Sequence, residues 1–192
     1  MKKALFLLLP LMFSLTACNG NGGSTSGSSS QSSTSQGGSE KTMTFDFVND
    51  FDQYKEGFPY VKADTGVYDG SLGDISIKGR GCFVSSYSGA GYLMMKNKDG
   101  FAANGLAFIA NSSTFGTIKQ IKFSTPSSAS SKATYYVAIG DTAYTDSVST
   151  GTEYKGQGQS FTVTGSGNYF CISSNNSEVN GQLATIEITY LA

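Results

Sequence analysis

From Met43 to its end, this 192-residue sequence predicts an all-β domain, a two-sheet antiparallel β-sandwich of about nine strands with little helix. Apolar and polar residues alternate in short segments, which indicates half-buried antiparallel strands. Glycine-rich stretches separate these segments, and no window keeps a helical spacing of apolar residues over three turns. Short strands at regular spacing with turns between them are typical of a sandwich.

Five segments alternate clearly, and four further segments are strand candidates. The alternating segments read TFDF at 44–47, DISIK at 74–78, QIKFS at 120–124, SFTVT at 160–164 and TIEITY at 185–190. The other candidates are residues 92–96, 106–110, 134–139 and 169–173. Because side chains alternate along a strand, Ile186 and Ile188 should point inward and Glu187 to the other face. For the same reason, one of the neighbours Tyr135 and Tyr136 should face outward.

The first 17 residues predict a secretory signal peptide. Lys2 and Lys3 form a basic head, and an apolar run follows from Ala4 to Leu15. This run is broken by Pro10 and is shorter than the roughly 20 residues that a membrane-spanning helix needs. A signal of this kind places the rest of the chain outside the cytoplasm.

The residues Leu15-Thr16-Ala17-Cys18 resemble the lipobox of bacterial lipoprotein signal peptides. The resemblance implies cleavage before Cys18, a diacylglyceride on its sulfur and commonly a further acyl chain on its nitrogen. Two such signals give stable attachment to a membrane. The alternative is an ordinary secretory signal that is cut at Ala17. We expect an extracytoplasmic protein anchored to the bacterial membrane or cell surface through Cys18.

Residues 18–42 predict the lipidated cysteine and a flexible linker. From Asn19 to about Lys41 the chain is dominated by Gly, Ser, Thr, Asn and Gln, without aromatic or branched aliphatic residues. Such a composition offers nothing to bury against the entropy of ordering it. A Gly/Ser chain of about 22 residues spans on the order of 25–30 Å. The predicted organisation is a signal peptide at 1–17, this linker, and a β-sandwich domain at 43–192.

The order of the strand segments resembles a recurrent extracellular module of bacteria. The resemblance lies in YLMM at 92–95, LAFI at 106–109, GTIKQIKF at 116–123, SFTVT at 160–164 and ATIEITY at 184–190. Such modules are jelly-roll-like β-sandwiches in lipoproteins of unknown function, sometimes joined to secreted nucleases or proteases, and they are similar in architecture to carbohydrate-binding modules. The resemblance implies a jelly-roll-like fold, and it transfers no binding residue to this chain.

The residue types argue against catalysis and against nucleic acid as a partner. The formal net charge is −1 and no basic block occurs, so the positive surface that nucleic acid requires is missing. The chain has no histidine, which excludes Ser-His-Asp and Cys-His pairs and histidine-containing zinc sites. Paired carboxylates remain available, but Asp46 and Glu187 lie on polar strand faces, where solvated carboxylates are expected. We expect a protein that is not an enzyme and has no cofactor.

One segment could in principle bind a hard cation. Asn49-Asp50-Phe51-Asp52 places oxygen ligands at alternate positions, although it lacks the glycine and the distal glutamate of an EF-hand loop. The alternative, which we favour, is that Asn49 and Asp50 end the first strand in a turn. No metal ligand is therefore assigned.

Tyrosines are the candidate ligand-binding residues, since sugars stack on aromatic rings and bind placed polar groups. The alternative for each ring is packing under a loop or across a sheet, and the absence of tryptophan weakens the case for a strong glycan site. The candidates lie near predicted loops or on the outward side of a strand: Tyr54, Tyr60, Tyr87, Tyr92, Tyr136, Tyr144 and Tyr154.

Two cysteines remain after lipidation of Cys18. Outside the cytoplasm Cys82 and Cys171 could form a disulfide, which would stabilise the fold by around 4 kcal/mol in the entropic account. The alternative is two separate buried thiols that act as small hydrophobic residues.

Two functions remain open. The first is a membrane-anchored lipoprotein that displays a non-catalytic binding module for glycan or another extracellular polymer. The second is a structural or protein-interaction domain of the cell envelope without a small ligand. An exposed row of aromatic side chains would favour the first, and a large apolar patch would favour the second.

Overall fold

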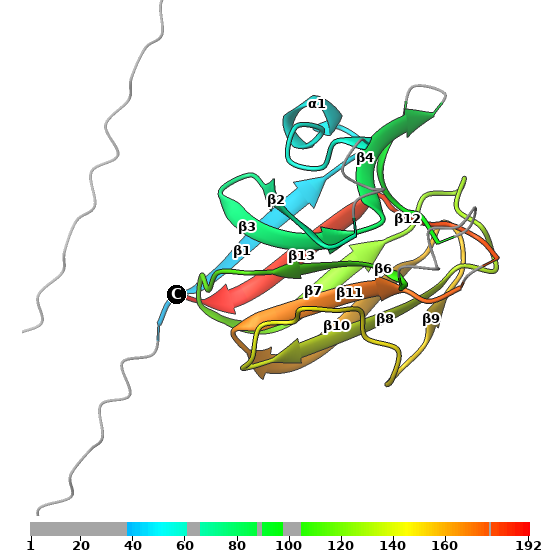
Figure 1. Cartoon of the computed structure of the whole chain (residues 1–192). Helices are drawn as coiled ribbons and strands as arrows, with labels where there is room; N and C mark the ends of the chain where they lie inside the picture. The colour runs from blue at the N-terminus through cyan, green and yellow to red at the C-terminus, as the bar shows by residue number, and fades with distance from the viewer. Residues whose placement is uncertain (1–37, 61–65, 88–89, 98–104, 177) are drawn as a thin grey trace, which may run out of the picture. The chain divides into compact units, whose positions relative to one another are not determined.

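The computed structural model describes residues 38–60, 66–87, 90–97, 105–176 and 178–192, and it confirms the all-β antiparallel sandwich (Figure 1). Sheet A consists, in spatial order, of β1 (Glu40–Asp46), β13 (Thr185–Leu191), β7 (Thr117–Ser124) and β10 (Ser160–Gly167). Sheet B consists of β2 (Tyr68–Leu72), β3 (Ile75–Arg80), β6 (Ala107–Asn111), β11 (Tyr169–Ser174), β8 (Thr134–Gly140) and β9 (Tyr154–Lys155). Sheet C is small and consists of β12 (Gly181–Leu183), β5 (Ala90–Met95) and β4 (Cys82–Tyr87). One helical turn, α1 (Phe51–Tyr54), follows β1.

All nine predicted strand segments lie in or overlap a strand, and the described residues contain four strands that the sequence pattern did not indicate. Two of these, β9 and β12, have only two and three residues, too few to show an alternation. In β4 the consecutive residues Cys82, Phe83 and Val84 are all buried, so the two faces do not differ in polarity. In β2 the central residues are Asp69, Gly70 and Ser71, a composition typical of a turn.

The domain begins earlier than residue 43, where the composition placed its boundary. β1 starts at Glu40, and the first three residues of the strand pair with Leu191, Tyr190 and Thr189 of β13. Ser39 accepts a backbone hydrogen bond from Ala192, so the two chain segments are joined up to the C-terminus. The partner strand, rather than local composition, orders the polar residues Glu40 to Thr42.

Single residues carry the chain from one sheet into the next. Gly81 separates β3 of sheet B from β4 of sheet C, and its φ of +64° is one that residues with a side chain rarely adopt. Ala184 separates β12 of sheet C from β13 of sheet A, and Asn168 separates β10 of sheet A from β11 of sheet B. Sheet C therefore closes one side of the sandwich as a corner between the two larger sheets.

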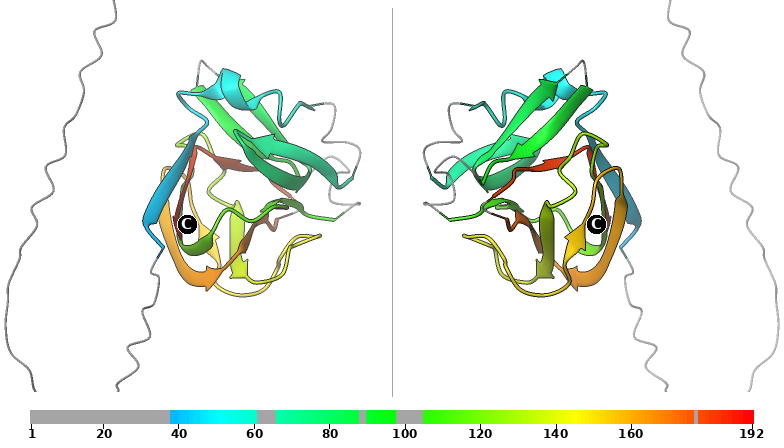
Figure 2. Two further views of the ribbon diagram at one scale, coloured as in Figure 1. Left: turned by 90° about the vertical axis from the view of Figure 1, so that its left-hand side faces the viewer. Right: turned by 90° about the vertical axis from the view of Figure 1, so that its right-hand side faces the viewer.

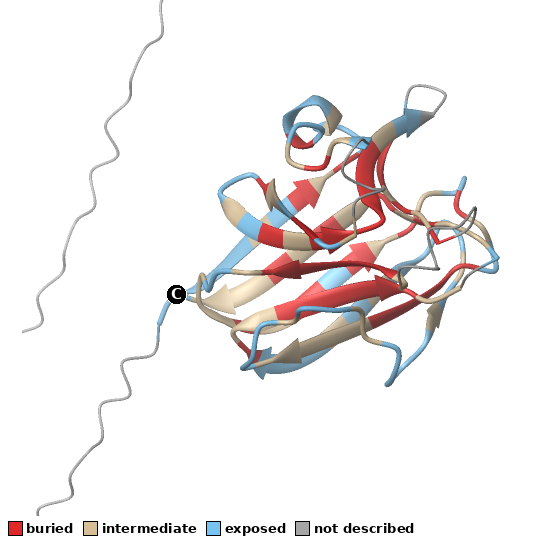
Figure 3. Ribbon diagram, in the orientation of Figure 1, coloured by how far each residue is buried: buried red, intermediate tan, exposed pale blue. Residues whose placement is uncertain are grey.

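One hydrophobic core fills the space between the sheets. Each sheet supplies fully buried side chains, for example Ile186 from sheet A, Ile172 from sheet B and Leu93 from sheet C. Figure 3 shows buried residues along the whole of β6 and most of β11, whereas along β7 buried residues are interspersed with intermediate and exposed ones. As predicted, Ile186 and Ile188 point inward with no exposed surface, and Glu187 is on the other face.

The outer face of sheet B is covered by the segment between β8 and β9, residues 141–153, which we call the cover loop. A row of four side chains across neighbouring strands, Arg80, Phe108, Ser173 and Tyr136, holds this loop. Arg80 donates to Asp146 at 2.5 Å, the Ser173 hydroxyl accepts from the Val148 amide at 2.8 Å, and Tyr136 donates to Glu153 at 2.7 Å. Phe108 packs in a cluster with Tyr144 and Val148. Around this row sheet B is thus buried on both faces, whereas Asp69 of β2 and Ser76 of β3 stay exposed. Sheet A keeps one face open.

The alternation in β13 predicts effects of very different size for substitutions at two neighbouring residues. Ile188→Ala removes a fully buried side chain, and such changes cost about 2–5 kcal/mol of unfolding free energy. Glu187→Ala changes a partly exposed side chain and should alter it by no more than about 0.5 kcal/mol. Urea unfolding should show a much lower midpoint for Ile188→Ala only. A larger effect of Glu187→Ala would contradict the observed register.

Candidate functional site

The open face of sheet A carries polar side chains in three rows that run across all four strands. The rows are given by the pairing of β1, β13, β7 and β10. The first row is Asp46, Thr185, Ser124 and Ser160, the second is Thr44, Glu187, Lys122 and Thr162, and the third is Thr42, Thr189, Gln120 and Thr164. All twelve side chains can donate or accept hydrogen bonds.

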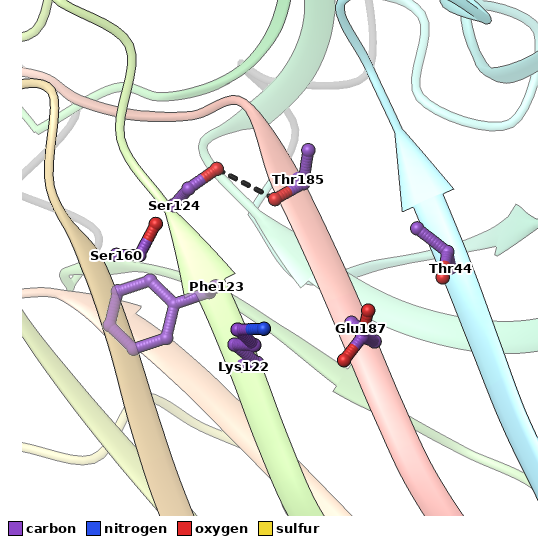
Figure 4. Close-up of a pocket in the computed structure, with 7 residues that line it drawn as sticks. All are labelled: Thr44, Lys122, Phe123, Ser124, Ser160, Thr185 and Glu187. Carbon is purple, nitrogen blue, oxygen red and sulfur yellow. Dashed lines mark hydrogen bonds between the residues drawn. The ribbon is translucent and has the colours of Figure 1, made fainter.

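An open depression of about 250 Å³ lies on this face. Six hydrophilic residues of the first two rows line it, together with Phe123, whose side chain belongs to the core: the six are Thr44, Lys122, Ser124, Ser160, Thr185 and Glu187. Figure 4 shows Lys122 and Glu187 on adjacent strands in the middle of the face, with Thr44 on one side and Ser124, Ser160 and Thr185 toward one end. Lys122 and Glu187 are direct cross-strand partners in the register of β7 and β13.

Hydroxyl contacts hold parts of this face in place. The Ser124 and Thr185 hydroxyls are 2.6 Å apart, and those of Thr42 and Thr189 are 3.4 Å apart. The depression therefore offers hydroxyl groups that both donate and accept, one ammonium donor and one carboxylate acceptor. Such a set suits a ligand with many hydroxyl groups, and it lacks the apolar lining of a site for a hydrophobic small molecule.

Three of the predicted ligand-binding tyrosines are buried, so their rings are not available to a ligand on the surface of the described domain. Tyr54 is 4% exposed and packs edge-on against Phe45 and Phe47. Tyr92 is 6% exposed in β5. Tyr136 does face outward from sheet B, as one of the tyrosine pair was expected to do, but the cover loop reduces its exposure to 7%. Tyr135, its neighbour, lies in the core, where burial raises the pKa of its phenol to about 12.

Of the other four predicted tyrosines, the three whose side chains the structure describes do not form a stacking platform. Tyr144 is half-buried in the cover loop against sheet B, and Tyr154 is half-buried with its ring 5.6 Å from that of Phe123. Tyr60 is 54% exposed, and its ring stands edge-on to Phe83 at 4.9 Å. Tyr87 ends β4, and its side chain lies outside the described residues. The six rings that the structure describes come from different parts of the fold and do not line a common surface.

The predicted lipobox, with Cys18 as the predicted lipidation site, lies outside the described residues. In the part of the chain that the structure describes, no helix has the length and apolar character that a membrane span requires.

The segment Asn49 to Asp52 forms a turn and the start of α1, as the favoured interpretation predicts. Asp46 accepts hydrogen bonds from the amides of Val48 and Asn49, and its other carboxylate oxygen accepts from the Asn49 side chain at 2.7 Å. These bonds, the Asn49 side chain first, hold the pKa of Asp46 below its ordinary value. Asp52 pairs with Lys55 at 2.6 Å. Among the described residues, no three acidic, cysteine or histidine side chains gather in a way that could hold a metal ion.

Cys82 and Cys171 are two separate buried thiols, the alternative to a disulfide. The Cys82 thiol donates to the carbonyl oxygens of Arg80 and Phe108. Cys171 lies under the cover loop, within 3.7 Å of the Asp146 carbonyl oxygen. Burial raises the pKa of the Cys171 thiol to about 11 and raises that of Cys82 further. Both thiols are therefore protonated and poorly reactive at neutral pH.

Comparisons with known proteins leave the family open. No model of a known protein family matches the chain, and no curated protein matches its sequence.

Most of the residues on the open face of sheet A were not predicted as candidate binding residues from the sequence. The signal was present, because 120–124, 160–164 and 185–190 each show a polar face, and Asp46 and Glu187 were noted as carboxylates on such faces. The pattern does not say which strands are neighbours, so it could not bring Lys122 beside Glu187 or Ser160 beside Ser124.

The burial of both thiols predicts selective alkylation. In the unacylated chain from Cys18 to Ala192, iodoacetamide at neutral pH should modify Cys18 and spare Cys82 and Cys171, because both are fully buried. In urea all three should react, as counted by mass spectrometry. A native mass that is lower by two hydrogens and is restored by a reductant would show a disulfide instead.

Proposed function

We propose that this chain is a lipoprotein, anchored outside the cytoplasm through Cys18, whose sandwich domain is a non-catalytic module that binds glycan on the open face of sheet A. One observation carries the binding part of the proposal. The cover loop buries the outer face of sheet B along the row from Arg80 to Tyr136, whereas on sheet A the side chains of Thr44, Lys122 and Thr162 remain exposed.

The chemistry of the open face supports a glycan over other ligands. Rows of hydroxyl groups repeat at the spacing of strands across the sheet, about 4.8 Å, and of every second residue along it, about 7 Å. A polymer of repeating units with many hydroxyl groups can meet such rows at several points. Lys122 and Glu187 add a charged donor and a charged acceptor, whose hydrogen bonds are stronger than those between neutral groups.

The absence of histidine from the chain supports a non-catalytic role, since most hydrolytic templates require it. The anchor is supported by the lipobox residues, by the Gly/Ser-rich segment after them, and by the position at which the folded domain begins. β1 starts at Glu40, at the end of that segment.

The anchor predicts that Cys18→Ala abolishes lipid attachment. Cells that express the variant should incorporate no labelled palmitate into the protein, and the protein should be released or remain unprocessed. Cys171→Ala, a change to a buried cysteine, is the control and should leave labelling unchanged. Equal labelling of Cys18→Ala and the unmodified protein would contradict the lipoprotein assignment.

The binding face predicts the effect of two charge-removing substitutions. An array of soluble and cell-wall polysaccharides, probed with the chain from Cys18 to Ala192, should show binding to glycan. For the glycan that binds, Lys122→Ala and Glu187→Gln should each raise Kd about tenfold, since a hydrogen bond to a charged group contributes roughly 1.5–3 kcal/mol.

The matched controls are Lys132→Ala and Glu178→Gln, which change exposed residues away from sheet A and should leave Kd unchanged. Equal losses in the controls and the face variants would place the glycan elsewhere. No binding to any polysaccharide would favour the alternative, a structural or protein-interaction domain of the envelope.

A further inference from the structure

The chain enters the folded domain through an edge strand, and this arrangement has a mechanical consequence. β1 is the outermost strand of sheet A, and its start lies beside the C-terminus (Figures 1 and 2). We propose that β1 is a shear anchor: tension between the N-terminal attachment and a ligand on sheet A acts along the β1–β13 ladder and loads all its hydrogen bonds together. The inference rests on the proposed membrane attachment and binding face.

The register gives the direction of the force. Glu40 pairs with Leu191 at one end of β1, and Asp46 pairs with Thr185 at the other. Thr185 in turn pairs with Ser124, which pairs with Ser160, so the first row of the open face lies at the end of the sheet away from Glu40. A ligand held there and a tether at Glu40 pull in opposite directions along the strands. Interstrand bonds of an antiparallel pair are perpendicular to the strands, so such a force shears seven residue pairs at once.

Aromatic packing holds the far end of β1 against this pull. Phe45 and Phe47 are 5% and 0% exposed, and the Tyr54 ring of α1 stands edge-on to them at 6.0 Å and 5.3 Å. The Phe47 amide also donates to the Ala184 carbonyl oxygen at 3.0 Å. To slide toward the tether, β1 must draw both phenylalanine rings out of the core and away from Tyr54.

A force applied between the N-terminal segment and the C-terminus loads the β1–β13 ladder in a different direction. Glu40 and Leu191 are cross-strand partners, and the Ala192 amide donates to the Ser39 carbonyl oxygen. A force that separates the N-terminal segment from the C-terminus therefore acts across the ladder and opens its hydrogen bonds one after another. The same strand pair should thus resist a pull along its length and yield to a pull at its open end.

Single-molecule force spectroscopy on the unacylated chain from Cys18 to Ala192 tests this anisotropy. One handle is attached to the Cys18 thiol. The second is attached either to a tag after Ala192 or to an azide at Ser127→p-azidophenylalanine, an exposed position three residues beyond the end of β7. At equal loading rate, the rupture force should be about twofold or more higher for the Ser127 handle, because the bonds are loaded together. An equal or lower force would overturn the proposal.

A tyrosine variant tests the aromatic part separately. Tyr54→Leu should lower the rupture force in the Ser127 geometry and leave it unchanged in the C-terminal geometry, where opening begins at Glu40. Tyr144→Leu, the same change at a tyrosine of the cover loop, should alter neither force. A Tyr54→Leu effect that is equal in both geometries would overturn the role of Tyr54, and the comparison within the unmodified chain stands if this variant does not fold. Neither lipid labelling nor glycan binding enters the measurement, so its failure is distinct from failure of the proposed function.

Discussion

The register of β13 between β1 and β7 is the constraint on which the rest of the structure depends. It places Ile186 and Ile188 in the core beside Ile121 and Phe123 of β7, and it places Glu187 beside Lys122 on the open face. A slip of one residue would turn every side chain of the strand to the opposite face. The core and the polar face are thus set by the same pairing, and so is the junction with the N-terminal segment, because the same strand also orders β1.

The two large sheets differ in what happens to their outer faces. On sheet B, the row from Arg80 to Tyr136 binds the cover loop, and a small apolar cluster seals it. Arg80 also donates twice to the Leu106 carbonyl oxygen, so this buried guanidinium is satisfied within the fold. The hydrogen bond from Arg80 holds the pKa of Asp146 below its ordinary value, so the pair persists at neutral pH. Because the cover loop packs on the outer face of sheet B, the outer face of sheet A is the large open sheet surface of the described domain.

The tyrosines show why a binding site could not be predicted from residue type. The chain has no tryptophan, and its aromatic residues supply much of the core, as Tyr54, Tyr68 and Tyr135 do. Their hydroxyl groups reach polar partners at the margin of the core: Tyr135 donates to the Gln182 carbonyl oxygen, and Tyr68 to that of Cys82. A tyrosine beside a predicted loop can therefore either pack in the core or bind a ligand at the surface, and only its surroundings in three dimensions distinguish the two roles.

The sequence by itself determined the fold class, nine of the strand segments and the inward direction of residues such as Ile188, because side-chain alternation is a local property of a strand. It also predicted a lipobox at Leu15 to Cys18 and showed the change of composition before the domain. Only the tertiary structure decided that Glu40 to Thr42 belong to β1, that the cover loop buries Tyr136, and that Lys122 and Glu187 share one depression. These features depend on which strands are neighbours and on segments distant in sequence that cover them, and local periodicity carries no information about either.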